Sequence, residues 1–168
     1  VGSMSMGEAP GGFSGGDKVA VISLMGRTFM EPLDCPFRKA DEVLAQIGDS
    51  ARTIVVDIHA EASSEKVAMG CYLDGRVSAV LGTHTHIQTS DQRVLPGGTA
   101  YITDVGMTGV VDSVLGMSTQ AVLSRFLTQV PTKFELAEGA TALHGVVLEI
   151  SARSGRAVSI ERVAEPEN

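Results

Sequence analysis

The sequence predicts an α/β fold, in which helices pack against a largely parallel central sheet. Short runs rich in β-branched apolar residues alternate with longer segments of helical periodicity along residues 18–128. Apolar residues make up 43% of the 168-residue chain and charged residues 20%, so one domain can bury a core. Residues 145–163 change rhythm and predict a closing antiparallel β-hairpin.

The first predicted elements are a strand and a helix. Residues 18–24 (KVAVISL) form an apolar, β-branched run of strand length. The helix begins near Asp34 and Pro36, since a polar cap followed by proline in the first turn is typical of a helix start. Apolar residues then recur at helical spacing until Gly48, which is expected to end the helix.

The next strand is expected at the centre of the sheet. Residues 53–58 (TIVVDI) are apolar on both faces, as in a strand that is covered on both sides. A helix over 65–73 follows, with Ser63 or Ser64 as its cap. The remaining predicted elements are strands over 77–81, 100–103, 145–151 and 157–163, a helix from Ser118 to about residue 128, and a turn at Ser154 and Gly155.

Charge and composition exclude several classes of function. The net charge is −7, and clustered positive charge is needed to bind long nucleic acid or an anionic membrane, so neither is an expected partner. The sequence has no apolar run of the ~18–20 residues that a membrane helix needs. Cys35 and Cys71 lie far apart and are expected to be reduced thiols. The cytoplasm is therefore the expected location.

The sequence divides into three parts. Residues 1–16 lack the pattern of a signal peptide and are rich in glycine, so a flexible lead-in is expected, and Gly2-Ser3-Met4 is compatible with a cloning scar. Residues 17–164 form the predicted domain, and residues 165–168 a short tail.

Three of the four histidines lie just beyond two predicted strands. His59 follows the strand 53–58, and His84 and His86 follow the strand 77–81. Functional residues of α/β folds gather at the carboxyl ends of strands, and neutral imidazole is a common metal ligand. An extended His-x-His segment would place both rings on one side, whereas a turn would direct them to two ions. His144 has no such neighbour and is expected to be structural or on the surface.

Several consecutive segments resemble a known family over residues 17–163. They are LMGR (24–27), DIHAEASSEK (57–66), YLDGRVSAV (72–80), GTHTH (82–86) and LPGGTAYITDVGMTG (95–109). In this order they resemble the YmdB-like metallophosphoesterases of the calcineurin-like superfamily. The resemblance implies a layered α/β/β/α sandwich, here incomplete, that ends in the antiparallel hairpin.

The same resemblance implies a phosphodiesterase that hydrolyses small cyclic nucleotides such as 2′,3′-cAMP. It places His59, His84 and His86 as ligands of two divalent metal ions, with iron or manganese favoured and zinc possible. Two such ions would clamp the phosphate and activate a water that attacks phosphorus. Glu61 and Asp104 are candidates to hold the second ring nitrogen of a histidine ligand.

The sequence departs from the family pattern before the first predicted strand. Family members carry metal-binding Asp, Glu and Asn residues and a Gly-Asn-His segment whose histidine is the general acid, whereas the only asparagine here is Asn168. No catalytic general acid is therefore assigned, and part of the ligand set must come from elsewhere. The missing strands would also leave a sheet edge open, which favours a homo-oligomer.

Two alternatives to this enzyme remain open. One is a non-catalytic, truncated or degenerate scaffold that forms an oligomer. The other is a hydrolase with a single zinc ion held by the three histidines.

Overall fold

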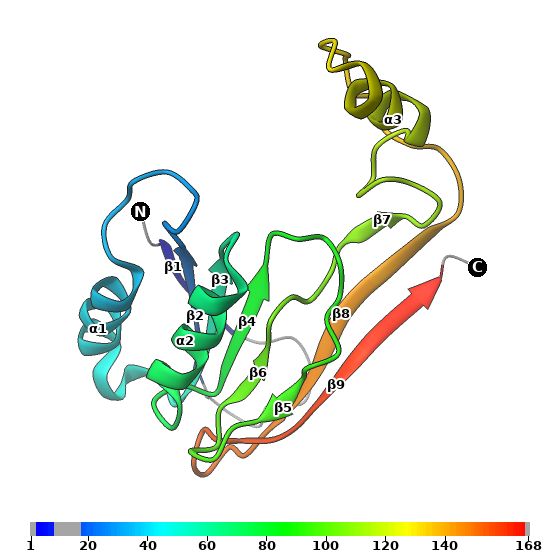
Figure 1. The fold of residues 1–168 in the computed structure, drawn as a ribbon. Coiled ribbons are helices and arrows are strands. Elements are labelled where there is room, and N and C mark those ends of the chain that lie inside the picture. Colours follow the sequence, from blue (N-terminus) through cyan, green and yellow to red (C-terminus); the bar gives the residue numbers. More distant parts are fainter. Residues whose placement is uncertain (1–2, 9–17, 167–168) are drawn as a thin grey trace.

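The computed structural model describes residues 3–8 and 18–166, which form two sheets and three α-helices (Figure 1). The larger sheet has six strands in the order β1-β2-β3-β4-β6-β5. Neighbouring strands among β2, β3, β4 and β6 are parallel, while β1 and β5 are antiparallel edge strands. The strands are β1 (Ser3–Glu8), β2 (Lys18–Met25), β3 (Thr53–His59), β4 (Ala79–Thr83), β5 (Arg93–Val94) and β6 (Ala100–Ile102).

Two helices cover one face of this sheet: α1 (Pro36–Ile47) and α2 (Ser63–Leu73) (Figure 1). In α1 the buried residues Ala40, Val43 and Ile47 recur at helical spacing, and they share a core with alternate residues of β2 and β3. Gly48 ends α1 with a φ of 48°, as predicted, and a short 3-10 turn, η1 (Gly48–Ser50), follows.

The other face of the large sheet carries a second sheet of three antiparallel strands. These are β7 (Thr108–Val110), β8 (Thr141–Ile150) and β9 (Ala157–Pro166). A separate apolar cluster joins Ala79, Ala100 and Ile102 of the large sheet to Ala157 and Ile160 of β9. The layers are therefore helices, sheet and sheet, which confirms the predicted α/β fold class and its closing hairpin.

The third helix, α3 (Thr119–Thr128), projects beyond the far end of β8, away from both layers of the core (Figure 1). Val122 is its buried residue. None of the helices in the described residues has the length and apolar character that are needed to cross a membrane.

The structure differs from the sequence prediction at the amino-terminal end. Residues 3–8 were expected in a flexible lead-in, but they form β1 and pair with β2 from Ser3↔Ser23 to Glu8↔Lys18. The edge of β2 that was expected to be open is therefore paired. The glycine-rich segment of the predicted lead-in lies within residues 9–17, outside the described residues.

Smaller differences concern element ends. Residue Ala62 is the cap of α2 and makes no side-chain cap bond, so Ser63 and Ser64 are the first helical residues rather than caps. Strands β5 and β7 were not predicted, because runs of two and three residues are too short for a periodic signal.

Candidate functional site

The site lies where the parallel strands end. His59 is the last residue of β3 and His84 follows β4 directly, and these two strands are neighbours. Their imidazole rings meet edge to face, with centroids 4.8 Å apart and planes at 84°. His59 Nε2 lies 3.0 Å from His84 Nδ1. Two of the three predicted metal ligands are thus brought together.

Glu61 holds the other nitrogen of His84. Its Oε2 atom lies 2.7 Å from His84 Nε2, and both side chains are accessible to solvent. A carboxylate accepts hydrogen bonds, so Nε2 of His84 carries the proton of this pair. The structure therefore places Glu61 where the sequence analysis expected an orienting carboxylate.

A chain of hydrogen bonds holds His59 from the opposite side. Asp57 accepts hydrogen bonds from Ser23 Oγ (3.1 Å) and from Thr83 Oγ1 (3.0 Å). Thr83 Oγ1 also lies 3.1 Å from His59 Nδ1. Because the single proton of the Thr83 hydroxyl points to Asp57, its oxygen must accept from His59 Nδ1. His59 therefore carries its proton on Nδ1 and turns the lone pair of Nε2 towards His84.

The space between the two rings is suited to a cation. With Glu61 accepting from Nε2 of His84, a neutral His84 presents its Nδ1 lone pair to the Nε2 lone pair of His59. The two lone pairs repel each other unless a proton or a metal ion lies between them. Two nitrogens 3.0 Å apart, each about 2.1 Å from one ion, would meet at that ion at roughly a right angle.

These residues alone do not complete a metal site. In residues 3–8 and 18–166, no group of three or more His, Cys, Asp or Glu side chains is arranged to hold a metal ion. The donor chemistry of His59 and His84 fits an ion, but two imidazoles leave most of its coordination sphere to other ligands.

His86 does not join the His59–His84 pair. The backbone turns between the histidines, with a φ of 110° at His84 and 64° at His86. Such angles are rare for residues other than glycine and cluster at functional sites. Of the two geometries open for a His-x-His segment, the structure adopts the turn, and exposed His86 lines a separate cavity with Ile87 and Gln88.

Asp104 has a different role from the predicted one. It is fully buried, and its Oδ2 atom lies 3.1 Å from Lys66 Nζ, also fully buried. Asp104 also accepts hydrogen bonds from the backbone N–H groups of Thr85 (2.9 Å) and Gly106 (3.0 Å). It therefore supports the backbone of the loop at residues 84–88, called the histidine loop below, rather than an imidazole ring.

Sequence reasoning missed Lys66, whose Nζ also donates to the carbonyl of Thr83 at 3.1 Å. The available signal was its spacing, because Lys66, Met69 and Leu73 fall on one face of α2 and all are buried. A lysine on the buried face of a helix needs a charged or polar partner.

Gly82 is needed for packing of the strands. A Cβ atom on Gly82 would lie 1.8 Å from the carbonyl oxygen of Thr103 and 2.9 Å from Lys66 Cδ. Glycine therefore allows the backbone after β6 to approach the end of β4, beside the histidine loop.

Comparison with known proteins adds the family. The family model described as "YmdB-like protein" matches residues 6–163, which is most of the chain. The chain belongs to the YmdB-like family. This family is part of the metallophosphoesterase superfamily, so the resemblance seen in the sequence is confirmed.

Relatives of this YmdB-like chain include a curated enzyme and two solved structures. A 2′,3′-cyclic-nucleotide 2′-phosphodiesterase of Bacillus subtilis (strain 168) is 56% identical over 148 residues, which cover 88% of this chain and 56% of the relative. A hypothetical protein from Thermus thermophilus has a TM-score of 0.89 at 44% identity, covering 98% of this chain and 62% of that one. A novel phosphatase from Mycoplasma pneumoniae has a TM-score of 0.86 at 30% identity, covering 98% and 57%. The YmdB-like chain thus spans little more than half the length of these relatives.

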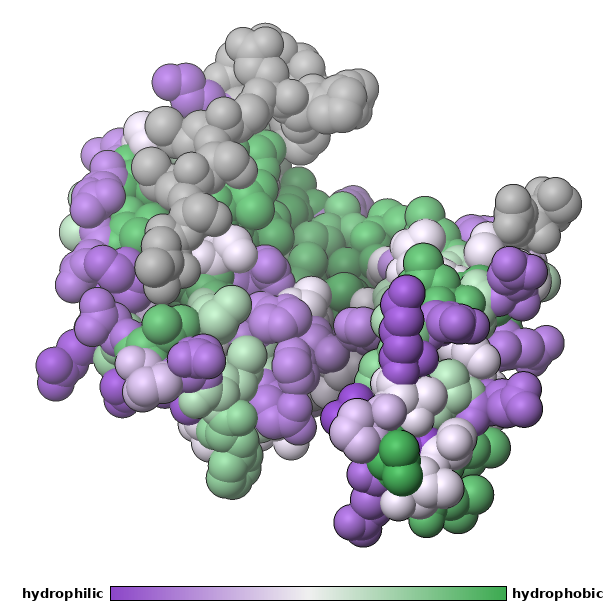
Figure 2. All heavy atoms as spheres, turned by 90° about the horizontal axis from the view of Figure 1, so that it is seen from above, coloured by the Kyte–Doolittle hydropathy of each residue, from purple (hydrophilic) through white to green (hydrophobic). Residues whose placement is uncertain are grey.

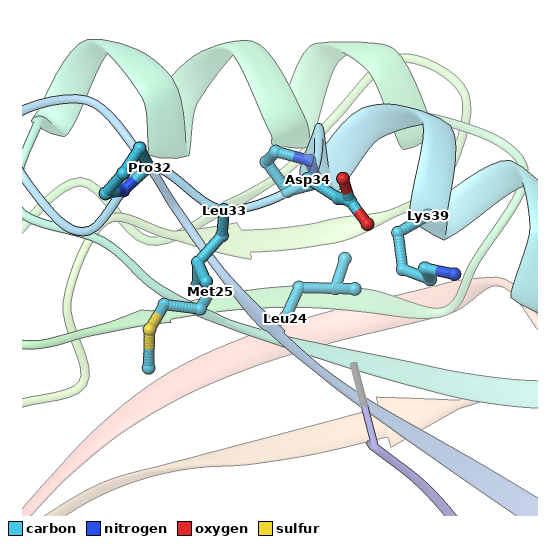
Figure 3. Close-up of a pocket in the computed structure, with 7 residues that line it drawn as sticks. Leu24, Met25, Pro32, Leu33, Asp34 and Lys39 are labelled. Atoms are coloured by element: carbon cyan, nitrogen blue, oxygen red, sulfur yellow. The ribbon is translucent and has the colours of Figure 1, made fainter. Parts of the chain in front are cut away.

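A second cavity of this YmdB-like protein lies beside α1, at the end where the parallel strands of the large sheet finish. It has a volume of about 460 Å³, and the end of β2, the segment before α1 and Lys39 of α1 line it (Figure 3).

Beside this cavity, the backbone N–H of Arg38 lowers the pKa of the Cys35 thiol. Cys35 and Cys71 are both free thiols.

Proposed function

We propose that this chain is part of a metal-dependent phosphodiesterase that hydrolyses small cyclic nucleotides such as 2′,3′-cAMP. The observation that carries the proposal is the 3.0 Å approach of His59 Nε2 to His84 Nδ1, with both rings oriented by acceptors on their other nitrogens. The named activity of the Bacillus subtilis relative, 56% identical over most of this chain, supports this substrate class.

In this proposal His59 and His84 hold one divalent ion, and His86 contributes to a second. Iron or manganese is favoured and zinc is an alternative, because imidazole suits all three. The remaining ligands and the general acid come from residues beyond those in this chain or from another chain. Divalent ions, when bound, supply charge stabilisation to the phosphate and activate a water.

Neighbouring residues of this chain fix the tautomers and positions of the imidazole rings for metal binding. Thr83 keeps the proton of His59 on Nδ1, and Glu61 keeps that of His84 on Nε2. Asp104 fixes the backbone of Thr85 between the two later histidines. The ligand nitrogens are thus set before an ion arrives, which reduces the cost of ordering them.

Metal content and hydrolysis test this proposal together. The purified chain is loaded with Mn²⁺, and bound metal is measured by mass spectrometry alongside hydrolysis of 2′,3′-cAMP and bis-p-nitrophenyl phosphate. His84→Ala should lose metal and any hydrolysis, whereas the control Gln120→Ala on exposed α3 should keep both. Hydrolysis that survives His84→Ala would contradict the role given to this residue.

A non-catalytic scaffold is the second candidate. It is favoured by the incomplete ligand set among the described residues. Hydrolysis by the purified chain with no second polypeptide present would rule this candidate out.

A further inference from the structure

A cavity of about 570 Å³ opens beside His86, and neither His59 nor Glu61 lines it. Its walls come from the histidine loop, β7, the segment 111–115 and β8. Its lining includes His86, Ile87, Met107, Val111, Leu115 and His144. Its volume lies within the range of about 300–1,000 Å³ that is usual for small-molecule sites.

Several apolar side chains in the walls of this cavity are exposed to solvent and are not covered by other described residues. Ile87, Val111 and Leu115 are large, apolar and exposed. Exposed apolar groups that gather around a hollow mark a ligand site more often than they mark ordinary surface. Met107 adds a flexible, polarisable wall, which can pack against a flat ring.

One ring nitrogen in this apolar setting, Nδ1 of His144, lacks a hydrogen-bond partner among the described residues. His144 is half-buried, and its Nδ1 atom is shielded from solvent without a hydrogen bond to any described residue. Gly106, with a φ of 87°, lets the ring approach, since a Cβ there would lie 3.0 Å from Nδ1. A structural or surface role is expected from sequence for His144, and the structure places this residue in the same cavity as His86.

We propose that this cavity binds the nucleoside part of a cyclic nucleotide, with the base between the apolar walls and His144 in contact with it. The inference rests on the proposed function, because the phosphate would lie at His59 and His84, outside this cavity. His84 and His86 are two residues apart, so their Cα atoms lie within about 7 Å. A nucleotide spans a similar length from phosphorus to base, so one ligand can reach the histidines and the cavity together.

Gly109 offers a way to fill the cavity. It lies in β7 and lines both this cavity and an adjoining one of about 470 Å³. A Cβ atom there meets only the flexible end of Met107, at 3.6 Å, so a larger side chain can be added without backbone strain. Gly145 of β8 is a matched control, because its Cβ would meet only Leu143 at 3.8 Å and it lines neither cavity.

Calorimetric titration of adenosine into the purified chain tests the inference without requiring catalysis. Adenosine carries the base and ribose but no phosphate. The wild-type chain and Gly145→Leu should bind it equally, and Gly109→Leu should weaken binding by at least about tenfold. His144→Ala should weaken it by about threefold to tenfold, because the contact of the imidazole ring with the base is lost. No binding to the wild-type chain, or equal binding to Gly109→Leu, would overturn the inference.

A parallel titration separates this inference from the proposed function. Hydrolysis of bis-p-nitrophenyl phosphate and binding of one Mn²⁺ ion depend on His59 and His84, which do not line the cavity, so Gly109→Leu should leave the binding of that ion unchanged. If adenosine binds in the cavity but neither metal nor hydrolysis is found, the proposed function fails and the cavity assignment stands. If metal binding and hydrolysis are found but adenosine is not bound, the cavity assignment fails alone.

Discussion

Thr83 decides which nitrogen of His59 carries the proton. Its hydroxyl proton is given to Asp57, and Ser23 donates to the other oxygen of the same carboxylate. The only role left for the Thr83 oxygen towards His59 is that of acceptor. A side chain with no direct contact to an ion would thus control whether the imidazole can bind one.

Replacing Thr83 should therefore change the tautomer of His59. Thr83→Val keeps the shape but removes the acceptor, so His59 should become a mixture of tautomers, and the affinity for Mn²⁺ should fall by about 10- to 100-fold. Long-range ¹H–¹⁵N correlation spectra report the tautomer directly, and a metal titration reports the affinity. Thr83→Ser should restore both, because it keeps the hydroxyl.

Thr53→Val is the matched control for this experiment. Thr53 starts β3 in the same sheet and is buried, but it is remote from the histidines at the other end of the strand. An unchanged His59 tautomer in Thr83→Val, with unchanged metal affinity, would contradict the role given to Thr83.

Position along a strand was enough to predict from sequence which of the candidate residues lie together. His59 and His84 meet because parallel neighbours end at one edge, and Glu61 reaches His84 from two residues beyond β3. Asp104 could not be assigned in this way. Its partner Lys66 lies 38 residues earlier on a helix, and only the packed structure shows that this pair is buried.

At the scale of elements, buried charges on α2 anchor two loops of the site. Glu65 accepts hydrogen bonds from the backbone N–H groups of Arg27 and Thr28, each at 3.2 Å. Lys66 holds Asp104 and, through it, the backbone of the histidine loop. Helix α2, whose sequence gives no functional signal by itself, thus fixes the segments after β2 and β4.

Breaking the buried pair should be costly. Lys66→Met would leave Asp104 fully buried without its cation, so the free energy of unfolding should fall by about 3–5 kcal/mol. Urea denaturation followed by circular dichroism measures the change. Lys66→Met combined with Asp104→Asn should recover part of the loss, because the uncompensated charge is then removed.

Val67→Met is a suitable control, since Val67 is the next residue of α2 and is partly exposed. It should change the free energy of unfolding by less than about 0.5 kcal/mol. A loss in Lys66→Met no larger than that of this control would show that Asp104 is not held by the lysine.

Some element boundaries are set by a strong local sequence signal. Others depend on pairing with a neighbouring strand. Gly48 ended α1 as predicted, because a positive φ suits glycine. Strand β1 has a glycine and no β-branched residue, so its sequence gives a weak signal, and its existence depends on pairing with β2. Short β7 likewise depends on β8.

For the whole molecule, the layered core leaves one projecting region with much apolar surface. Phe126 and Leu127 of α3 are 76% and 82% exposed, and Leu123, Val130 and Leu136 nearby are also exposed. Seen from above, the molecule has two lobes, and green apolar side chains lie on the surface of both (Figure 2). Large apolar side chains that stay in water favour association.

We therefore expect the purified chain to form a homo-oligomer through α3, because another copy is the only apolar partner in such a sample. Fully burying a Phe or Leu side chain contributes about 1.5–3 kcal/mol, so two copies of Phe126 and Leu127 offer enough to offset part of the cost of association. Each copy carries a net charge of −7, so added salt should strengthen the assembly by screening repulsion.

Light scattering after size-exclusion chromatography tests this expectation. The wild-type chain should show a mass above the 17.5 kDa of one copy, and Phe126→Asp with Leu127→Asp should shift it towards 17.5 kDa. Gln120→Asp with Ser124→Asp adds the same charge to exposed polar positions of α3 and should leave the mass unchanged. Equal dissociation by both pairs would mean that charge, rather than the apolar surface of α3, controls assembly. A single-copy mass for the wild-type chain at every concentration would show that α3 does not mediate self-association.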